Sequence, residues 1–171
     1  NNGGDGFAIA RLLDQEGYTV NCYEVFINQR SVDCEVNRMK YLMSNAVIDI
    51  TNEATIEFNE AVIIDGLFGS GLNRAITDDR IQHAIKAINN SKKTVVAIDI
   101  PSGLFCDRVE GMGGVVKADF TITFESPKLS FLFPETGNLV GEFHVIDIGL
   151  DENYVKSIDS RCFLMELSDI K

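Results

Sequence analysis

The sequence has little of what marks several large classes of protein. Lys and Arg together number 15 against 26 Asp and Glu, which gives a formal net charge of −11. Because affinity for nucleic acid depends on basic side chains that neutralise phosphates, this balance argues against a nucleic-acid partner. No apolar run reaches the roughly 18 residues of a membrane-spanning helix, so we expect no membrane partner either.

The cysteines are also sparse and scattered. Cys22, Cys34, Cys106 and Cys162 show no CxxC spacing and no grouping with His, which argues against a zinc site and favours reduced thiols in a cytoplasmic protein. A basic-then-apolar secretion signal is absent. The chain has no initiator Met and begins inside a glycine-rich motif, so we expect a further segment upstream of Asn1.

The remaining composition is that of one globular domain. The chain has 171 residues, of which 45% are hydrophobic and 24% charged, enough for a sizeable core. Apolar periodicity predicts strands over residues 18–27, 46–50, 61–68, 94–98, 119–124 and 141–147. It predicts helices over residues 4–13 and 31–43, over about 11 residues after Asp78 and Asp79, and near Tyr154. Residues 129–133 are expected to form a loop packed on the sheet.

This alternation of strands and helices predicts an α/β fold, a doubly wound and mostly parallel sheet with helices on both faces. Ligands of such folds bind outside the carboxyl ends of the strands. Polar loops rich in small residues occupy residues 1–6, 69–75 and 99–103. We therefore expect these loops to converge on one site.

The opening NNGGDG runs directly into the apolar helix predicted from Gly4. Glycines let backbone N–H groups approach an anion closely, and a helix N-terminus adds unpaired N–H groups and a positive dipole end. The junction therefore fits a phosphate cradle. A glycine-rich turn before a helix also serves as a simple cap or tight bend, and the two interpretations remain open.

Five motifs stand in a characteristic order: NNGGDG with FAIARLL, DGLFGSGLNR, AIDIPSG, KADFTITFESPK and HVIDIG. In this order the chain resembles the YjeF N-terminal family from Asn1 to about Gly149. The resemblance implies a Rossmann-like fold, a bound potassium ion, and epimerisation of the R and S forms of hydrated NADH and NADPH (NADHX and NADPHX).

The resemblance also implies site residues. The implied substrate contacts are Asn1, Asn2, Gly3, Gly4, Asp5, Gly69, Ser70, Gly71, Leu72, Asn73, Arg74, Ala75 and Asp99. The implied potassium ligands are Asn2, Asp65 and Ser102. Their amide, carboxylate and hydroxyl oxygens are the donors that a hard cation prefers.

The same resemblance divides the chain. Residues 1–160 would be the epimerase domain without its N-terminal helix and first strand. Residues 161–171 would be a linker or the start of an ADP-dependent dehydratase domain, which implies a covalently linked second activity. The alternative function is a non-catalytic nucleotide-binding or dimerising scaffold, which would be expected to lose its ligand residues. Whether the chain forms a homo-oligomer, and which of NADHX and NADPHX it prefers, stay open.

For the reaction we expect Asp99 to be the general acid/base, with its pKa raised by partial burial. It would protonate the C6 hydroxyl, so that water leaves to give an iminium and returns to the other face; ring opening is the competing route. Asp65 and Asp99 also fit simple capping roles. Arg74 fits either a phosphate contact or a surface charge, and Lys128 receives no role.

Overall fold

The computed structural model describes residues 3–25, 30–160, 162 and 164–165. Its helices are α1 (Gly4–Gln15), α2 (Val32–Leu42), α3 (Asp79–Asn90), the 3-10 helix η1 (Leu129–Leu132), α4 (Gly137–Val140) and α5 (Glu152–Ser157). Its strands are β1 (Cys22–Glu24), β2 (Val47–Asp49), β3 (Val62–Asp65), β4 (Thr94–Ile98), β5 (Phe120–Phe124) and β6 (Glu142–Ile146).

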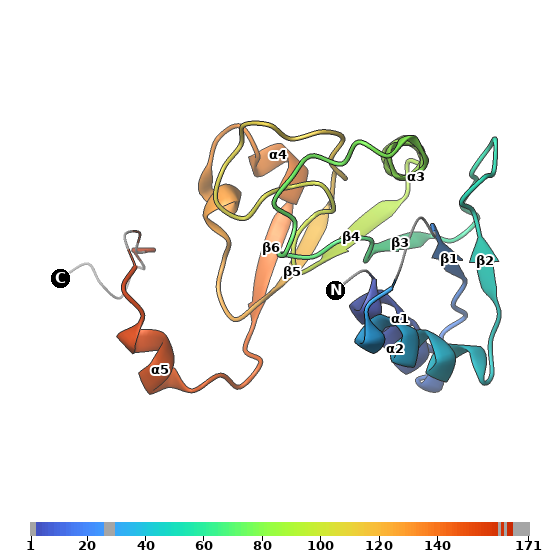
Figure 1. Cartoon of the computed structure of the whole chain (residues 1–171), viewed down its shortest axis with the longest axis horizontal. Coiled ribbons are helices and arrows are strands. Elements are labelled where there is room, and N and C mark those ends of the chain that lie inside the picture. Colours follow the sequence, from blue (N-terminus) through green and yellow to red (C-terminus); the bar gives the residue numbers. More distant parts are fainter. Residues whose placement is uncertain (1–2, 26–29, 161, 163, 166–171) are drawn as a thin grey trace.

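The strands form two sheets, and every pair within the described ranges is parallel. One sheet has the order β1-β2 and the other the order β3-β4-β5-β6. In Figure 1, α3 and α4 lie on one side of the strands, while α1 and α2 lie on the other. The predicted α/β class with parallel strands is thus confirmed, with the strands divided between two sheets. Parallel pairing places the carboxyl ends of β3, β4 and β5 at one edge.

Helix α3 packs its apolar stripe against β3 and β4. Asp78 begins the helix by accepting a hydrogen bond from the N–H of Arg80 at 3.0 Å. Ile85 and Ile88 are buried in one cluster with Ile63 and Val95 of the sheet. Removing such a buried aliphatic side chain costs about 2–5 kcal/mol, so this contact holds α3 on β3 and β4.

A second core joins the two N-terminal helices to the smaller sheet. Phe7 and Ala10 of α1 meet Cys34 and Tyr41 of α2, with Cys22 packed against them. Ser31 caps α2 by accepting a hydrogen bond from the N–H of Cys34 at 3.2 Å. A third cluster, built from Ile100, Leu104, Phe131 and Val140, supports the loops that follow β4 and β5.

Several predicted boundaries differ from the structure. Residues 129–133 were expected to be a loop, yet residues 129–132 form η1, whose Phe131 is buried. The strand predicted over residues 61–68 ends at Asp65, because the Asp65 carboxylate accepts a hydrogen bond from the N–H of Leu67 and turns the chain away. β1 is shorter than the predicted 18–27, of which residues 26–27 lie outside the described residues.

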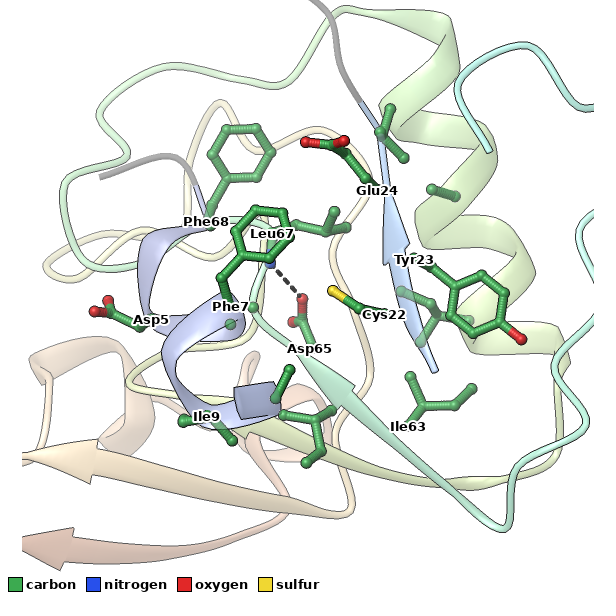
Figure 2. A pocket seen from close by; sticks show the side chains of 18 of the residues that line it. Asp5, Phe7, Ile9, Cys22, Tyr23, Glu24, Ile63, Asp65, Leu67 and Phe68 are labelled. Atoms are coloured by element: carbon green, nitrogen blue, oxygen red, sulfur yellow. Dashed lines mark hydrogen bonds between the residues drawn. The ribbon is translucent and has the colours of Figure 1, made fainter. Parts of the chain in front are cut away.

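β1 and β3 are each paired on one side, and both line one cavity. Figure 2 shows this cavity between them, closed on one side by α1. Among the described helices, none has both the length and the apolar character that crossing a bilayer requires.

Candidate active site

The loop before α1 lies against the loop after β3. Gly3 adopts the left-handed conformation, with φ of 82°, which a glycine takes without strain. A Cβ built on Gly66 would lie 3.0 Å from Cα of Gly6 and 3.1 Å from Cδ1 of Ile98. The backbones therefore approach as closely as glycine allows. Asn1 and Asn2, the expected substrate and potassium contacts, lie outside the described residues.

Asp65 and Ser102 meet where β3 and β4 end. The Ser102 hydroxyl donates to Oδ1 of Asp65 at 2.6 Å, and the Ser102 N–H donates to Oδ2 at 2.8 Å. Burial raises the pKa of Asp65, against the opposing effect of these hydrogen bonds and one from the N–H of Leu67. The Phe68 carbonyl oxygen lies 3.3 Å from Oγ of Ser102. The Asp65 carboxylate and the Phe68 carbonyl thus both lie within hydrogen-bond distance of the Ser102 hydroxyl, and carboxylate, carbonyl and hydroxyl oxygens are the ligands that fit a hard cation such as potassium.

The glycine loop after β3 is held by the segment after β4. The Cys106 thiol donates to the carbonyl of Ser70 at 3.2 Å, and Arg108 donates to the carbonyl of Asn73 at 2.6 Å. Gly71 and Arg74 remain exposed, and a Cβ added at Gly71 would meet nothing within 4 Å. The loop is therefore anchored through its backbone while its outer residues face open space.

Asp99 follows β4 in the left-handed conformation, with φ of 64°, which is uncommon for a residue with a side chain. Its N–H donates to the Ile122 carbonyl at 2.7 Å, which fixes this conformation. The carboxylate is buried, and its Oδ1 lies 2.9 Å from Nζ of Lys128 and 3.3 Å from the N–H of Phe124. A Cβ at Gly69 would lie 3.9 Å from Oδ2, so Asp99 adjoins the glycine loop.

The net pKa shift of Asp99 is opposite to the expected one. Burial raises the pKa, but the hydrogen bond and positive charge of Lys128, together with hydrogen bonds from Ser70 and the N–H of Phe124, lower it below its ordinary value. The expectation of a raised pKa was wrong because it included burial without the buried cation. Asp99 is therefore a carboxylate near neutral pH, which is the form that accepts a proton.

Lys128 is the site residue to which the sequence analysis gave no role. It ends the motif KADFTITFESPK in the loop that follows β5. One signal was available: loops after neighbouring parallel strands meet at one edge. The structure shows that β5 pairs with β4, which Asp99 follows. The pairing of Lys128 with Asp99 could not be predicted from the sequence, because the two residues lie in different loops.

A second charged cluster, also missed, lies at the end of β1. Glu24 accepts hydrogen bonds from Arg30 and from Arg38, whose Nε lies 3.2 Å from both carboxylate oxygens. Glu24 and Arg30 line the same cavity as the glycine loops. The cavity therefore carries charges at its rim on the β1 side as well as on the β4 side.

One cavity of about 1830 Å³ brings most of the expected residues together. It is lined by Gly3, Asp5, Asp65, Asp99 and the whole loop Gly69, Ser70, Gly71, Leu72, Asn73, Arg74 and Ala75. Gly4 is buried and Ser102 contacts the site through Asp65; neither lines the cavity. In Figure 2, Phe7, Cys22 and Leu67 gather in its apolar part. The polar part thus lies at the carboxyl ends of β3 and β4.

This arrangement defines a Rossmann-like α/β protein with a glycine-lined, partly polar cavity at the carboxyl edge of parallel strands. Residues 1–130 match the family described as YjeF-related protein N-terminus. The chain therefore belongs to the YjeF N-terminal family.

Named relatives share most of this chain. An NAD(P)H-hydrate epimerase from Leuconostoc citreum (strain KM20) is 38% identical over 151 residues, which cover 88% of this chain and 66% of that protein. A bifunctional NAD(P)H-hydrate repair enzyme Nnr from Coxiella burnetii is 31% identical over 166 residues, 97% of this chain and 34% of that protein. The chain thus spans about two thirds of the first and one third of the second.

A solved structure supports the fold. The crystal structure of yeast ynu0, YNL200c, aligns with a TM-score of 0.69 over 96% of this chain and 70% of that one, at 17% sequence identity. At this identity the likeness bears on the fold alone, and it confirms the predicted α/β class.

Proposed function

We propose that this chain is the epimerase part of a nicotinamide nucleotide repair enzyme, which interconverts the R and S forms of NADHX and NADPHX. One observation carries the proposal: the glycine loop 69–75, the loop at Gly3 and the Asp99 carboxylate line a single cavity. Relatives whose alignments cover 88% or more of this chain are named NAD(P)H-hydrate epimerase or bifunctional NAD(P)H-hydrate repair enzyme.

The ligand would lie across the two glycine loops. Backbone N–H groups at the start of α1 and in residues 69–75 would bind the pyrophosphate, since glycine permits close approach and the helix dipole favours an anion. The exposed Arg74 would contact a phosphate. The nicotinamide end would then reach Asp99, which adjoins Gly69.

Asp99 would act as the proton-transfer group. The hydrated ring carries a hydroxyl at C6 beside the ring nitrogen. Because Asp99 is a carboxylate, the leaving C6 hydroxyl takes its proton from solvent water; as the C6–O bond breaks, the nitrogen lone pair forms an iminium and water departs, and the proton that Asp99 later accepts returns to solvent. A carboxylate at this place accepts a proton from the water that adds to the opposite face. The lowered pKa keeps Asp99 in the ionised form that this step requires, and ring opening remains the rival route.

Asp65 and Ser102 would hold a potassium ion together with Asn2, which lies outside the described residues. The convergence of the Asp65, Ser102 and Phe68 oxygens supports this site. The ion would supply positive charge that orients the dinucleotide. In the absence of substrate, the melting temperature should be higher in potassium chloride than in an equal concentration of N-methylglucamine chloride.

We also propose a covalently linked dehydratase domain beyond residue 160. The Coxiella burnetii relative, named bifunctional, is about three times as long as the aligned segment, which supports this. Cys22, Cys34, Cys106 and Cys162 are reduced thiols, which supports a cytoplasmic location. The intact mass of the protein from its source would test the linked domain. A mass that leaves no room for a second domain would contradict it.

The deciding experiment follows the two epimers directly. An unequal R/S mixture of NADPHX is incubated with the protein and separated by chiral chromatography, beside a buffer blank that records spontaneous exchange. We expect the mixture to approach its equilibrium ratio faster with protein than in the blank. Equal rates would contradict the function and favour a non-catalytic scaffold.

A further inference from the structure

Lys128 is fixed at Asp99 by a complete set of acceptors. Its ammonium group lies 2.9 Å from Oδ1 of Asp99 and donates to the carbonyl oxygens of Phe124 at 3.0 Å and Ser126 at 3.2 Å. An ammonium group has three N–H donors, and here each has one acceptor. The side chains of Lys128 and Asp99 are 15% and 10% exposed, so solvent screens the pair far less than it would at the surface.

The backbone is shaped to bring the two groups together. The residue after β4, Asp99, and the residue after β5, Glu125, both adopt left-handed conformations, with φ of 64° and 63°. The N–H of Glu125 donates to the Ile146 carbonyl at 2.8 Å, and that of Ser126 donates to the Phe124 carbonyl at 2.7 Å. These bonds turn the chain so that Lys128 points back at the end of β4.

Other groups around the pair do not replace this charge. In the segment after β4, the Cys106 thiol interacts electrostatically with both Lys128 and Asp99. Burial raises the pKa of this thiol, so it stays neutral near pH 7. Asp107 beside it adds a negative charge. The Thr123 hydroxyl lies 3.4 Å from Oδ1 of Asp99 and is uncharged. The positive charge that balances Asp99 in this site is that of Lys128.

We propose that Lys128 is a positioning residue for the epimerisation: it holds the Asp99 carboxylate in one orientation toward the cavity and keeps it in the ionised form. This rests on the proposed function for its consequence in catalysis. Asp99 lines the cavity, whereas Lys128 is not among the lining residues. Lys128 therefore contributes through Asp99 and makes no contact with substrate.

The test compares Lys128→Met, which keeps the stem and removes the charge, with Lys128→Arg, which keeps the charge. Lys86→Met on the exposed face of α3 is the matched control. We expect Lys128→Met to lower kcat about tenfold to a hundredfold near pH 6, with a smaller change in KM. In the pH profile of kcat, the acidic limb of Lys128→Met should lie at higher pH than that of the parent, because the Asp99 carboxylate protonates more readily without the neighbouring positive charge. Lys128→Arg and Lys86→Met should keep the limb in place.

A second measurement needs no activity. The carboxyl carbon of Asp99, assigned by its loss in Asp99→Asn, is titrated by NMR in the parent and in Lys128→Met. We expect a higher midpoint in the variant. An unchanged midpoint, or an unchanged acidic limb and kcat, would overturn the proposal. Lys128→Gln replaces Lys128→Met if circular dichroism shows that the latter does not fold. A parent without epimerase activity would reject the proposed function, while the titration would still decide the role of Lys128.

Discussion

Ser102 binds both oxygens of the Asp65 carboxylate, one through its hydroxyl at 2.6 Å and the other through its backbone N–H at 2.8 Å. The two residues are 37 positions apart, and both are almost completely buried. A buried carboxylate without partners is costly, so this contact ties the end of β3 to the loop after β4. The same contact sets the spacing of the two strand ends that form the polar part of the cavity.

Replacing Ser102 with Ala should therefore destabilise the fold. The hydroxyl is lost from Asp65 and from the N–H of Phe68, which donates to it at 2.9 Å. We expect a loss of about 1–3 kcal/mol in the free energy of unfolding, the range for leaving a buried polar group without its partner. Urea denaturation measures this. Ser157→Ala in the exposed helix α5 serves as control, and equal losses for both variants would contradict the prediction.

Potassium should stabilise the parent through Asp65. Asp65→Asn keeps the shape of the side chain but removes its charge, so the rise in melting temperature between N-methylglucamine and potassium buffers should shrink. At a potassium concentration about 100 times Kd the parent should gain about 2.7 kcal/mol. Asp79→Asn, at an exposed residue of α3, should keep the full rise. The same rise in Asp65→Asn as in the parent would remove Asp65 from the ion site.

Gly71→Val should weaken dinucleotide binding more than it lowers stability. A Cβ at Gly71 meets nothing within 4 Å, so the free protein has room for the side chain, which would project where the ligand is proposed to lie. Gly103→Val is the contrast, because its Cβ would lie 2.2 Å from the Gly114 carbonyl oxygen, and it should destabilise the fold. Calorimetry with NADP measures the affinity. Unchanged affinity in a folded Gly71→Val protein would place the ligand elsewhere.

Asp99→Asn tests the proton-transfer role. The amide keeps the size of the carboxylate but cannot accept the proton, so the rate at saturation should fall roughly 10²- to 10⁴-fold with a much smaller change in affinity. Single-turnover epimerisation of NADPHX provides both values. A saturating rate within about threefold of the parent, far less than that catalytic range, would exclude Asp99 as the base and favour ring opening or a bound water.

Thiol reactivity should follow burial. Burial, with the nearby charge of Glu24, raises the pKa of Cys22 to about 12, so the thiolate that reacts is scarce at pH 8. The exposed Cys162 should therefore react first with a disulfide reagent, and Cys22 much more slowly. The pKa of Cys22 in the folded protein also exceeds its ordinary value of 9.0. The protonated thiol therefore contributes to the stability of the folded state below pH 9.0, and this contribution is lost as the pH rises from 9.0 toward 12. Mass spectrometry of the labelled peptides checks the order, and Cys22 labelled as fast as Cys162 would contradict it.

The sequence by itself determined what depends on local spacing. The apolar stripe of α3 and the buried strand Thr94–Ile98 are each encoded within a few neighbouring residues, so periodicity predicted them. Loop positions at the carboxyl ends of parallel strands followed from the same pattern, which placed Asp99 and the glycine loop 69–75 at one edge. The ordered motifs were enough to predict the family.

Only the tertiary structure decided how distant groups pair and what that does to their charge. Asp99 and Lys128 meet because β4 and β5 are neighbours and the segments after both strands turn through left-handed residues. The direction of the Asp99 pKa shift depends on which of two opposing effects is larger: burial raises the pKa, and the nearby Lys128 cation lowers it. The sequence shows neither how deeply Asp99 is buried nor how close Lys128 lies to it. The division of the strands into two sheets and the contact between Asp65 and Ser102 likewise depend on packing across tens of residues, which no local pattern encodes.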